Sequence, residues 1–227
     1  MALSFVASAE SASSAITIPA TAQVGDLAVL FDYAWVNPGP ATDVTPSGWT
    51  NIAGNAAASF YRYRVTYKIV ALGEPGSSVT GMAGTQNDKV MLVFRDSGGP
   101  ILSVTPSTWN APAPVNTDPG SQSVLASGGN VPLIVLGMAA IDAGTAAFST
   151  ASPAFDGTAA NSQSDILAGY KLYDNSPADH TIDMGDLGSG NSLASGWLAL
   201  AVAGLPYSAG IETGQFIPGD PVQFRGT

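Results

Sequence analysis

The sequence predicts an all-β protein, namely an antiparallel two-sheet β-sandwich of jelly-roll-like form with an extended C-terminal arm. Three observations lead to this fold class. Several segments alternate apolar and polar residues, no segment keeps an apolar period of 3.6 residues between helix caps, and the 227 residues include 26 Gly and 16 Pro, which supply turns. A chain of this length can bury a core without disulfides. We assign residues 1–204 to the sandwich and residues 205–227 to the arm.

Two segments alternate clearly. In residues 60–70, every odd position from 61 to 69 is aromatic or aliphatic, whereas the even positions between them are Arg, Arg, Thr and Lys. Successive side chains of a strand point to opposite faces, so this pattern is typical of a strand with one face on the core. Residues 27–36 likewise carry large apolar side chains on one face, while Asp32 lies on the other. We expect the large side chains of both segments to line the core.

Continuous apolar runs indicate central strands. Residues 90–94, 131–141 and 197–202 are apolar almost throughout and are bounded by turn-forming or polar residues. Such runs are typical of strands that are covered on both faces. Shorter strands are expected at residues 4–7, 15–18, 77–80, 123–126, 166–173 and 181–184.

The two halves of the sandwich, residues 1–100 and 101–204, resemble each other weakly. Residues 67–69 (Tyr-Lys-Ile) match residues 170–172 (Tyr-Lys-Leu), and residues 27–30 and 133–136 precede them in the same order. One explanation is an internal duplication. The other is that any two-sheet sandwich repeats strand and turn chemistry at similar spacing, and both stay open.

The segment 205–227 lacks alternation but contains large apolar residues among turn formers. A disordered tail seldom carries such residues, whereas an extended arm needs them as anchors on a neighbouring subunit. We therefore interpret it as an assembly arm. Its expected anchors are Tyr207, Ile211, Phe216, Ile217 and Phe224.

Composition argues against two classes of partner. The formal net charge is -10 and the charged share is 11%, so the chain lacks the clustered Lys and Arg that neutralise nucleic-acid phosphates. The longest apolar stretch, residues 131–141, is shorter than the ~20 residues of a membrane-spanning helix. We expect neither nucleic acid nor membrane as a partner. Abundant neutral polar residues instead favour contacts between protein subunits.

One string resembles an enzyme motif. Residues 96–100, Asp-Ser-Gly-Gly-Pro, resemble the serine loop of trypsin-like proteases. That family places its catalytic histidine before the serine, but the single histidine here, His180, follows it, and there is no cysteine to match the family's disulfides. A glycine turn after a strand explains the string. We assign no catalytic residue and expect the protein not to be an enzyme.

Cofactor and metal motifs are also missing from the sequence. One histidine and no cysteine cannot form a typical zinc site, and no phosphate-binding loop or dinucleotide fingerprint occurs. We expect no cofactor and no metal. Asp183 and Asp186 offer oxygen ligands in a spacing that fits no EF-hand, so calcium binding there stays open.

Glycoside hydrolysis requires two carboxylates close together in space. The sequence alone neither identifies such a pair nor excludes one. The candidates are Asp26, Asp32, Asp156 and Asp174.

Two of the four tryptophans are candidate ligand contacts. Trp49 and Trp109 each follow a turn signal, at residues 46–48 and 106–108, so exposure on loops is expected. Aromatic rings can stack on the apolar faces of sugars. Trp35 and Trp197 lie in expected strands and are assigned to the core.

The order of short motifs in residues 2–95 resembles that of a recurrent type of phage and prophage protein. The motifs are ITIPA (16–20), GDLAV (25–29), PSGWT (46–50), YKIV (67–70), GEP (73–75) and LVFR (92–95). The resemblance implies a β-sandwich in the virion, as a head decoration or a tail or tail-fibre component. It also implies a homo-oligomer, such as a trimer or ring, in contact with other virion proteins.

Two alternatives remain. The first is a carbohydrate- or receptor-binding adhesin module that contacts a host-surface glycan. The less expected second is a glycoside hydrolase-type enzyme.

Overall fold

The protein is all-β. The computed structural model describes residues 2–36, 44–54, 61–108, 121–124, 131–142, 148, 151–161, 166–176, 180–183 and 191–204. These residues form fourteen strands and no helix. Accordingly, no helix in the described part of the chain is long and apolar enough to cross a membrane.

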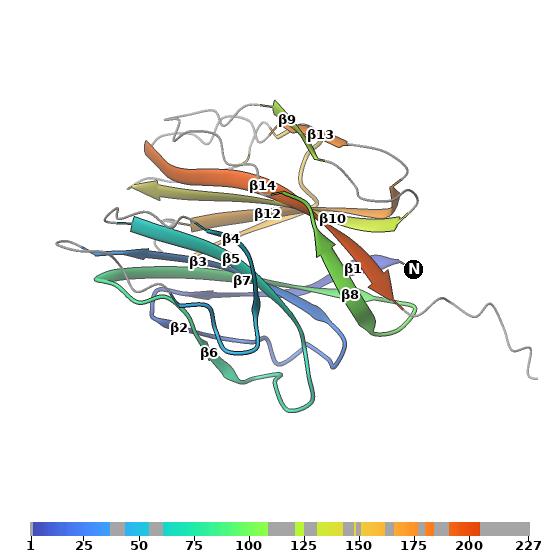
Figure 1. Cartoon of the computed structure of the whole chain (residues 1–227), viewed down its shortest axis with the longest axis horizontal. Coiled ribbons are helices and arrows are strands. Elements are labelled where there is room, and N and C mark those ends of the chain that lie inside the picture. Colours follow the sequence, from blue (N-terminus) through green and yellow to red (C-terminus); the bar gives the residue numbers. More distant parts are fainter. Residues whose placement is uncertain are drawn as a thin grey trace, which may run out of the picture.

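Two five-stranded antiparallel sheets make up the body of the molecule (Figure 1). Sheet 1 has the order β1-β7-β3-β5-β4 and sheet 2 the order β11-β12-β10-β14-β8. The strands of sheet 1 are β1 (Leu3–Ser11), β3 (Leu27–Trp35), β4 (Thr50–Gly54), β5 (Tyr61–Ile69) and β7 (Gln86–Asp96). Those of sheet 2 are β8 (Ile101–Pro106), β10 (Val131–Asp142), β11 (Gly157–Ala160), β12 (Ile166–Ser176) and β14 (Asn191–Gly204).

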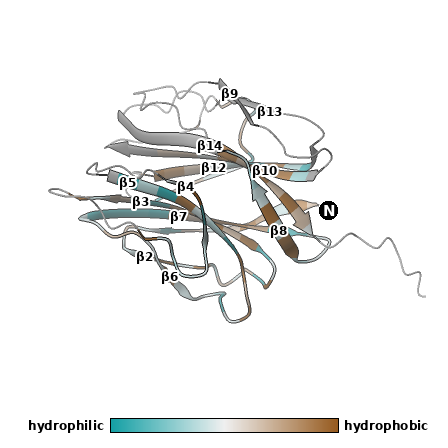
Figure 2. Ribbon diagram, viewed as in Figure 1, coloured by the Kyte–Doolittle hydropathy of each residue, from teal (hydrophilic) through white to brown (hydrophobic). Residues whose placement is uncertain are grey.

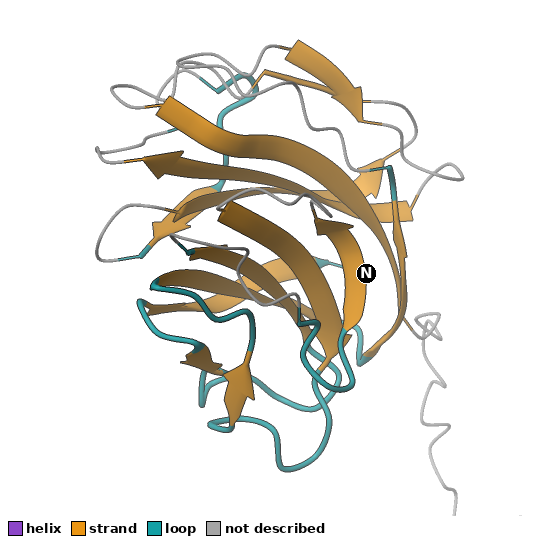
Figure 3. Cartoon of the chain, turned by 60° about the vertical axis from the view of Figure 1, so that its left-hand side comes forward, coloured by secondary structure: helices purple, strands orange, loops and turns teal. Residues whose placement is uncertain are grey.

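Two short ribbons lie outside the sheets (Figures 1 and 3). β2 (Ala15–Thr17) pairs with β6 (Ser78–Thr80) beside sheet 1, and β9 (Ser121–Val124) pairs with β13 (His180–Asp183) beside sheet 2. The protein is therefore layered as ribbon, sheet, sheet and ribbon.

The main core lies between the two sheets. Apolar side chains of both sheets form one buried cluster, and β8 and the adjoining end of β14 are visibly hydrophobic in Figure 2. The odd-numbered face of β3 enters this core as the alternation predicted. Its members from the three most central strands of each sheet include Val29, Phe31, Val65, Leu92, Ile134, Leu136, Ala168 and Leu198.

The outer faces of both sheets are also covered. Ile16 and Val79 of the first ribbon pack with Leu30 and Met91 of sheet 1. On sheet 2, Phe148 belongs to a buried cluster together with residues of β10, β12 and β14. This double covering explains the continuous apolar runs. β7, β10 and β14 each have a strand on both sides, which confirms the prediction of internal strands.

The strand predictions need three additions. Strands are found at all six of the shorter predicted segments, but β4, β8 and β11 were not predicted. All three are at sheet edges. The winding also differs from that of a jelly roll, whose strands alternate between the two sheets. Here every strand of sheet 1 precedes every strand of sheet 2 in the chain.

The two halves share one topology. Replacing each strand β1 to β7 by the strand seven places later converts the order of sheet 1, β1-β7-β3-β5-β4, into that of sheet 2, β8-β14-β10-β12-β11. The same replacement converts the ribbon β2-β6 into β9-β13. A shared strand order in sheet and ribbon supports the duplication hypothesis more strongly than similar turn spacing does.

The strand register corrects the sequence alignment of the halves by one residue. Leu27 pairs with Ile69, and Ile134 pairs with Leu172. Because Ile69 matches Leu172, the counterpart of Leu27 is Ile134 rather than Leu133. A one-residue shift moves a side chain to the other face, and both Leu27 and Ile134 face the core between the sheets.

Matching tyrosines join the halves. Tyr67 of β5 donates a hydrogen bond from its hydroxyl to the Val104 carbonyl of β8, at 3.4 Å. Its counterpart Tyr170 of β12 stacks on Phe5 of β1, with ring centroids 4.9 Å apart. Each tyrosine therefore contacts the first strand of the opposite half, as expected if the halves are related by an approximate two-fold axis.

Candidate functional site

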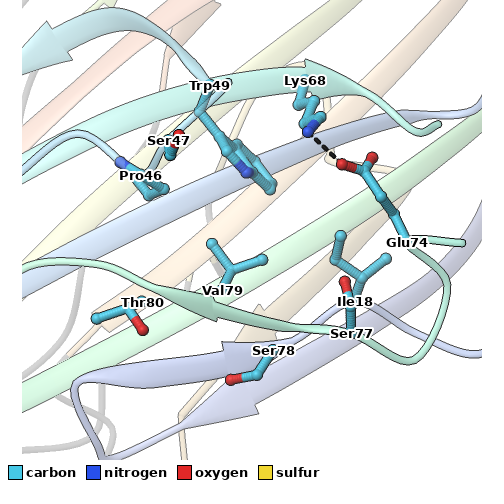
Figure 4. Close-up of a pocket in the computed structure, with 10 residues that line it drawn as sticks. All are labelled: Ile18, Pro46, Ser47, Trp49, Lys68, Glu74, Ser77, Ser78, Val79 and Thr80. Carbon is cyan, nitrogen blue, oxygen red and sulfur yellow. Dashed lines mark hydrogen bonds and ion pairs between the residues drawn. The ribbon is translucent and has the colours of Figure 1, made fainter.

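A cavity of about 280 Å³ opens on the outer face of sheet 1 (Figure 4). It lies between the turn at residues 46–49 and the first ribbon. Its apolar lining consists of Ile18, Pro46, Trp49 and Val79. Its polar lining consists of Ser47, Lys68, Glu74, Ser77, Ser78 and Thr80. We call this site the Trp49 cavity.

A tight turn sets the position of Trp49. Its backbone N–H donates to the Pro46 carbonyl at 3.0 Å, and Gly48 adopts a φ of 77°, which favours glycine. The predicted turn is therefore present. The expected exposure is not found, because the Trp49 side chain is only 8% exposed and packs in the cluster of Ile16 and Val79. The indole lines the cavity without standing free in solvent.

An ion pair closes one end of the cavity. Lys68 of β5 pairs with Glu74, and the second carboxylate oxygen of Glu74 accepts the Ala71 N–H at 2.8 Å. Burial alone would raise the pKa of Glu74, but the hydrogen bonds from Lys68 and Ala71 and the charge of Lys68 hold it below the ordinary value. Glu74 is thus ionised at neutral pH, and the pair contributes no net charge.

Several donors in the cavity have no partner in the described part of the chain. They are the indole N–H of Trp49 and the hydroxyls of Ser47 and Ser77. Ser78 and Thr80 flank Val79 on β6 and turn their side chains to the opposite, exposed face of the strand. Figure 4 shows the indole above Val79 and Ile18, with the Lys68–Glu74 pair to one side. The cavity therefore joins an aromatic edge, hydroxyl groups and a neutral ion pair.

A deeply buried pair of charges lies elsewhere on the same face of sheet 1. Asp32 of β3 and Lys89 of β7 are direct cross-strand partners, and their side chains are 1% and 0% exposed. Lys89 Nζ lies 2.5 Å from Asp32 Oδ1 and donates to the Met82 carbonyl at 3.0 Å, while the Met82 N–H donates to Asp32 Oδ2 at 2.7 Å. Burial raises the pKa of the Asp32 carboxyl, although Lys89 and the Met82 N–H act in the opposite direction.

A third ion pair joins the turn before β3 to the neighbouring strand β7. Arg95 donates from Nε and Nη2 to the two carboxylate oxygens of Asp26, each at 2.8 Å. Asp26 is 2% exposed and also accepts the Gln23 N–H at 2.7 Å. The hydrogen bonds that Arg95 donates to Asp26 are the main cause of the raised pKa of Arg95. This pair fixes the turn before β3 against β7.

The four carboxylates considered for glycoside hydrolysis have separate structural partners. Asp26 and Asp32 hold Arg95 and Lys89, as above. Asp156 pairs with Lys171 at 2.5 Å, and Asp174 accepts the Leu3 N–H at 3.0 Å. None of these contacts joins two of the four carboxylates.

The protease-like string forms the turn between β7 and β8. Gly98 donates its N–H to Asp96 Oδ1 at 3.1 Å, and Gly99 bridges back to Asp96 with a φ of 143°. Ser97 is exposed. The turn interpretation of residues 96–100 is thus confirmed.

Other predicted site residues cannot be placed. Trp109, Asp186 and the arm anchors Tyr207, Ile211, Phe216, Ile217 and Phe224 lie outside the described residues. His180 and Asp183 belong to β13, but their side chains are not described. Among the side chains that are described, no three His, Asp or Glu residues gather as a metal site.

Comparisons of the chain with protein-family models, with curated proteins and with solved structures found no match.

Proposed function

We propose that the chain is a structural component of a bacteriophage particle, as a head decoration or a tail or tail-fibre protein, and acts through subunit packing. The observation that carries this proposal is the role of the motif residues. Asp26 of GDLAV pairs with Arg95 of LVFR, and Lys68 of YKIV pairs with Glu74 of GEP. The segments that resemble phage proteins thus contact one another and stabilise the first half of the sandwich, sheet 1 and its turns.

The remaining features of the proposal concern assembly. In the described part of the chain, at least four of the seven basic residues pair with carboxylates, which leaves a largely neutral and acidic surface. Neutral surfaces can pack against other subunits without burying unpaired charge. We assign residues 205–227 to an arm that docks on a neighbouring copy in a symmetric homo-oligomer, such as a trimer or ring.

Particle composition tests the proposal. Purified virions from a host that produces the protein are digested and analysed by quantitative mass spectrometry, with a non-virion phage enzyme as the negative control. We expect the chain in several copies per particle. Its absence from particles that assemble while it is expressed would refute the proposal.

Deletion of residues 205–227 tests the arm separately. We expect the molar mass in solution, measured by light scattering, to fall to that of a smaller species while the sandwich stays folded. An unchanged oligomer would remove the arm hypothesis but not the particle assignment.

The second candidate function is a carbohydrate-binding adhesin of the particle. The Trp49 cavity favours it, because segments of ITIPA, PSGWT, YKIV and GEP meet there. A glycan array is the direct screen. Binding that is lost on substitution of Trp49 would support the adhesin, and the same array would test Trp109.

A further inference from the structure

The Trp49 cavity brings together side chains that are far apart in the sequence. Ile18 comes before β3, Trp49 before β4, Lys68 from the end of β5, and Val79 from β6. These segments surround a hollow that opens to solvent. A concave site where several segments meet, with an apolar floor and a few polar groups, is a candidate binding site.

The size of the cavity limits its ligand. Its volume of about 280 Å³ lies just below the ~300–1,000 Å³ of typical small-molecule sites. One six-membered ring with its substituents fits such a space, whereas a peptide segment or a nucleotide exceeds it.

The residues that line the cavity indicate the chemistry of the ring that would bind there. Trp49, Ile18 and Val79 offer an apolar surface, while Ser47 and Ser77 add hydroxyls. A hydroxyl can both donate and accept a hydrogen bond. The ligand that matches this lining has apolar C–H groups and several hydroxyls on the same small ring.

The Lys68–Glu74 ion pair disfavours charged ligands. Lys68 and Glu74 already neutralise each other, so a ligand carboxylate or ammonium would find no net charge to pair with. Neighbouring hydroxyls of a sugar can instead use both groups at once, since one accepts from the ammonium and the other donates to the carboxylate. The pair therefore favours a neutral diol.

The burial of Trp49 determines how its indole can contact a sugar. Because its side chain is only 8% exposed, the indole cannot offer a whole face to a sugar ring. Its N–H has no partner among the described residues and lies at the cavity. We therefore expect a hydrogen bond from the indole edge in place of full stacking.

We propose that the Trp49 cavity binds one neutral pyranose unit of a surface glycan, held by the Lys68–Glu74 pair, the hydroxyls of Ser47 and Ser77, and the indole N–H. This inference rests on the second candidate function and names its ligand class. A single ring in a small site gives weak binding, so we expect a dissociation constant of about 1 mM.

Ligand-observed NMR on the full chain tests the inference. The probes are methyl glycosides of glucose, galactose, mannose and N-acetylglucosamine, with glucuronate and N-acetylneuraminic acid as charged comparisons. We expect binding of at least one neutral glycoside and at least tenfold weaker binding of both acids. No binding of any neutral probe at ~20 mM, or a preference for the acids, would overturn the proposal.

Variants locate the binding. Glu74→Gln removes the carboxylate charge, and Ser77→Tyr fills the cavity from the side of the chain that also carries Val79; each should weaken binding at least tenfold. Trp35→Phe is the control, because Trp35 packs against the core between the sheets. Thermal melting confirms that each variant is folded. Undiminished binding by folded Ser77→Tyr would place the sugar elsewhere and refute the assignment.

The two proposals can fail independently. If the chain is found in particles but binds no sugar, only the cavity assignment falls. If it binds a neutral sugar but is absent from particles, only the particle assignment falls.

Discussion

Replacing Lys89 by Met tests how strongly the buried Asp32–Lys89 pair determines stability. Met keeps much of the length of the apolar stem but removes the ammonium group. Because Lys89 is fully buried, no water can replace its hydrogen bond to the Asp32 carboxylate. Asp32 would then keep one direct donor, the Met82 N–H.

The burial of the pair determines how much stability Lys89→Met should lose. Breaking a buried ion pair by removing one partner costs about 3–5 kcal/mol of unfolding free energy. For a chain of this size, each kcal/mol corresponds to about 2–4 °C in melting temperature, so we expect Tm to fall by about 6–20 °C. The double variant Asp32→Val/Lys89→Met removes both charges and should recover most of the loss.

The pH dependence of the stability loss provides a second test of the buried pair. Burial raises the pKa of Asp32, and loss of Lys89 raises it further. A carboxyl with a raised folded-state pKa contributes stability that is present below its unfolded value and lost as pH rises through the folded value. The Lys89→Met deficit should therefore be larger at pH 8 than at pH 4.

Urea unfolding of the wild type, both single variants and the double variant, at pH 4 and pH 8, measures these effects. A loss below about 1 kcal/mol for Lys89→Met, with no dependence on pH, is the behaviour of a solvated pair. That result would refute the argument from burial.

Four further predictions follow from other contacts. Gly25→Ala should destabilise the protein by more than about 2 kcal/mol in urea unfolding, because φ is 91° and the new Cβ would overlap the Pro100 side chain. Gly73→Ala is its control, with φ of 82° but nothing within 4 Å, and should cost only about 1 kcal/mol. Tyr170→Ala should cost about 3–5 kcal/mol, because Tyr170 packs against Phe5 and Phe94 between the halves; a loss under 1 kcal/mol would contradict this. Lys171→Ala should change stability by less than about 1 kcal/mol, because its pair with Asp156 is partly exposed; a larger loss would show a buried role. Glu74 has a lowered pKa, so its contribution to stability is present above its unfolded value and is lost as pH falls through the folded value; sugar binding measured by NMR should fall over the same acid range, and binding that persists after NMR shows Glu74 to be protonated would contradict its role.

Local patterns predicted the strands well where side chains alternate or run apolar over many residues. β3 and β5 follow the alternation of large side chains, and β10 follows an apolar run. β4, β8 and β11 are short edge strands of 5, 6 and 4 residues, and β4 and β11 are rich in small side chains. Too few residues alternate in them for periodicity to separate strand from loop.

The Trp49 cavity was only partly predictable. The turn before Trp49 and the turn at residues 73–75 are visible in the sequence, because Gly and Pro have local effects. That these two turns meet across β5 is not visible in the sequence, because it depends on the pairing of β2 with β6 and on the order of strands in the sheet. The burial of Trp49 and Asp32 has the same cause. The ribbon side of sheet 1 is covered by residues distant in the chain.

The arrangement of one sheet per half has a consequence for synthesis on the ribosome. All strands of sheet 1 are complete at residue 96, before the first residue of sheet 2 is made. At about 5–20 residues per second, the second half takes about 5–20 s longer to appear. During that interval the nascent first half has its own ribbon for one face, but Phe31, Leu92 and Phe94 still lack the layer that will bury them. The growing chain is therefore most prone to aggregate halfway through translation, and ribosome-associated chaperones would be needed most at that stage.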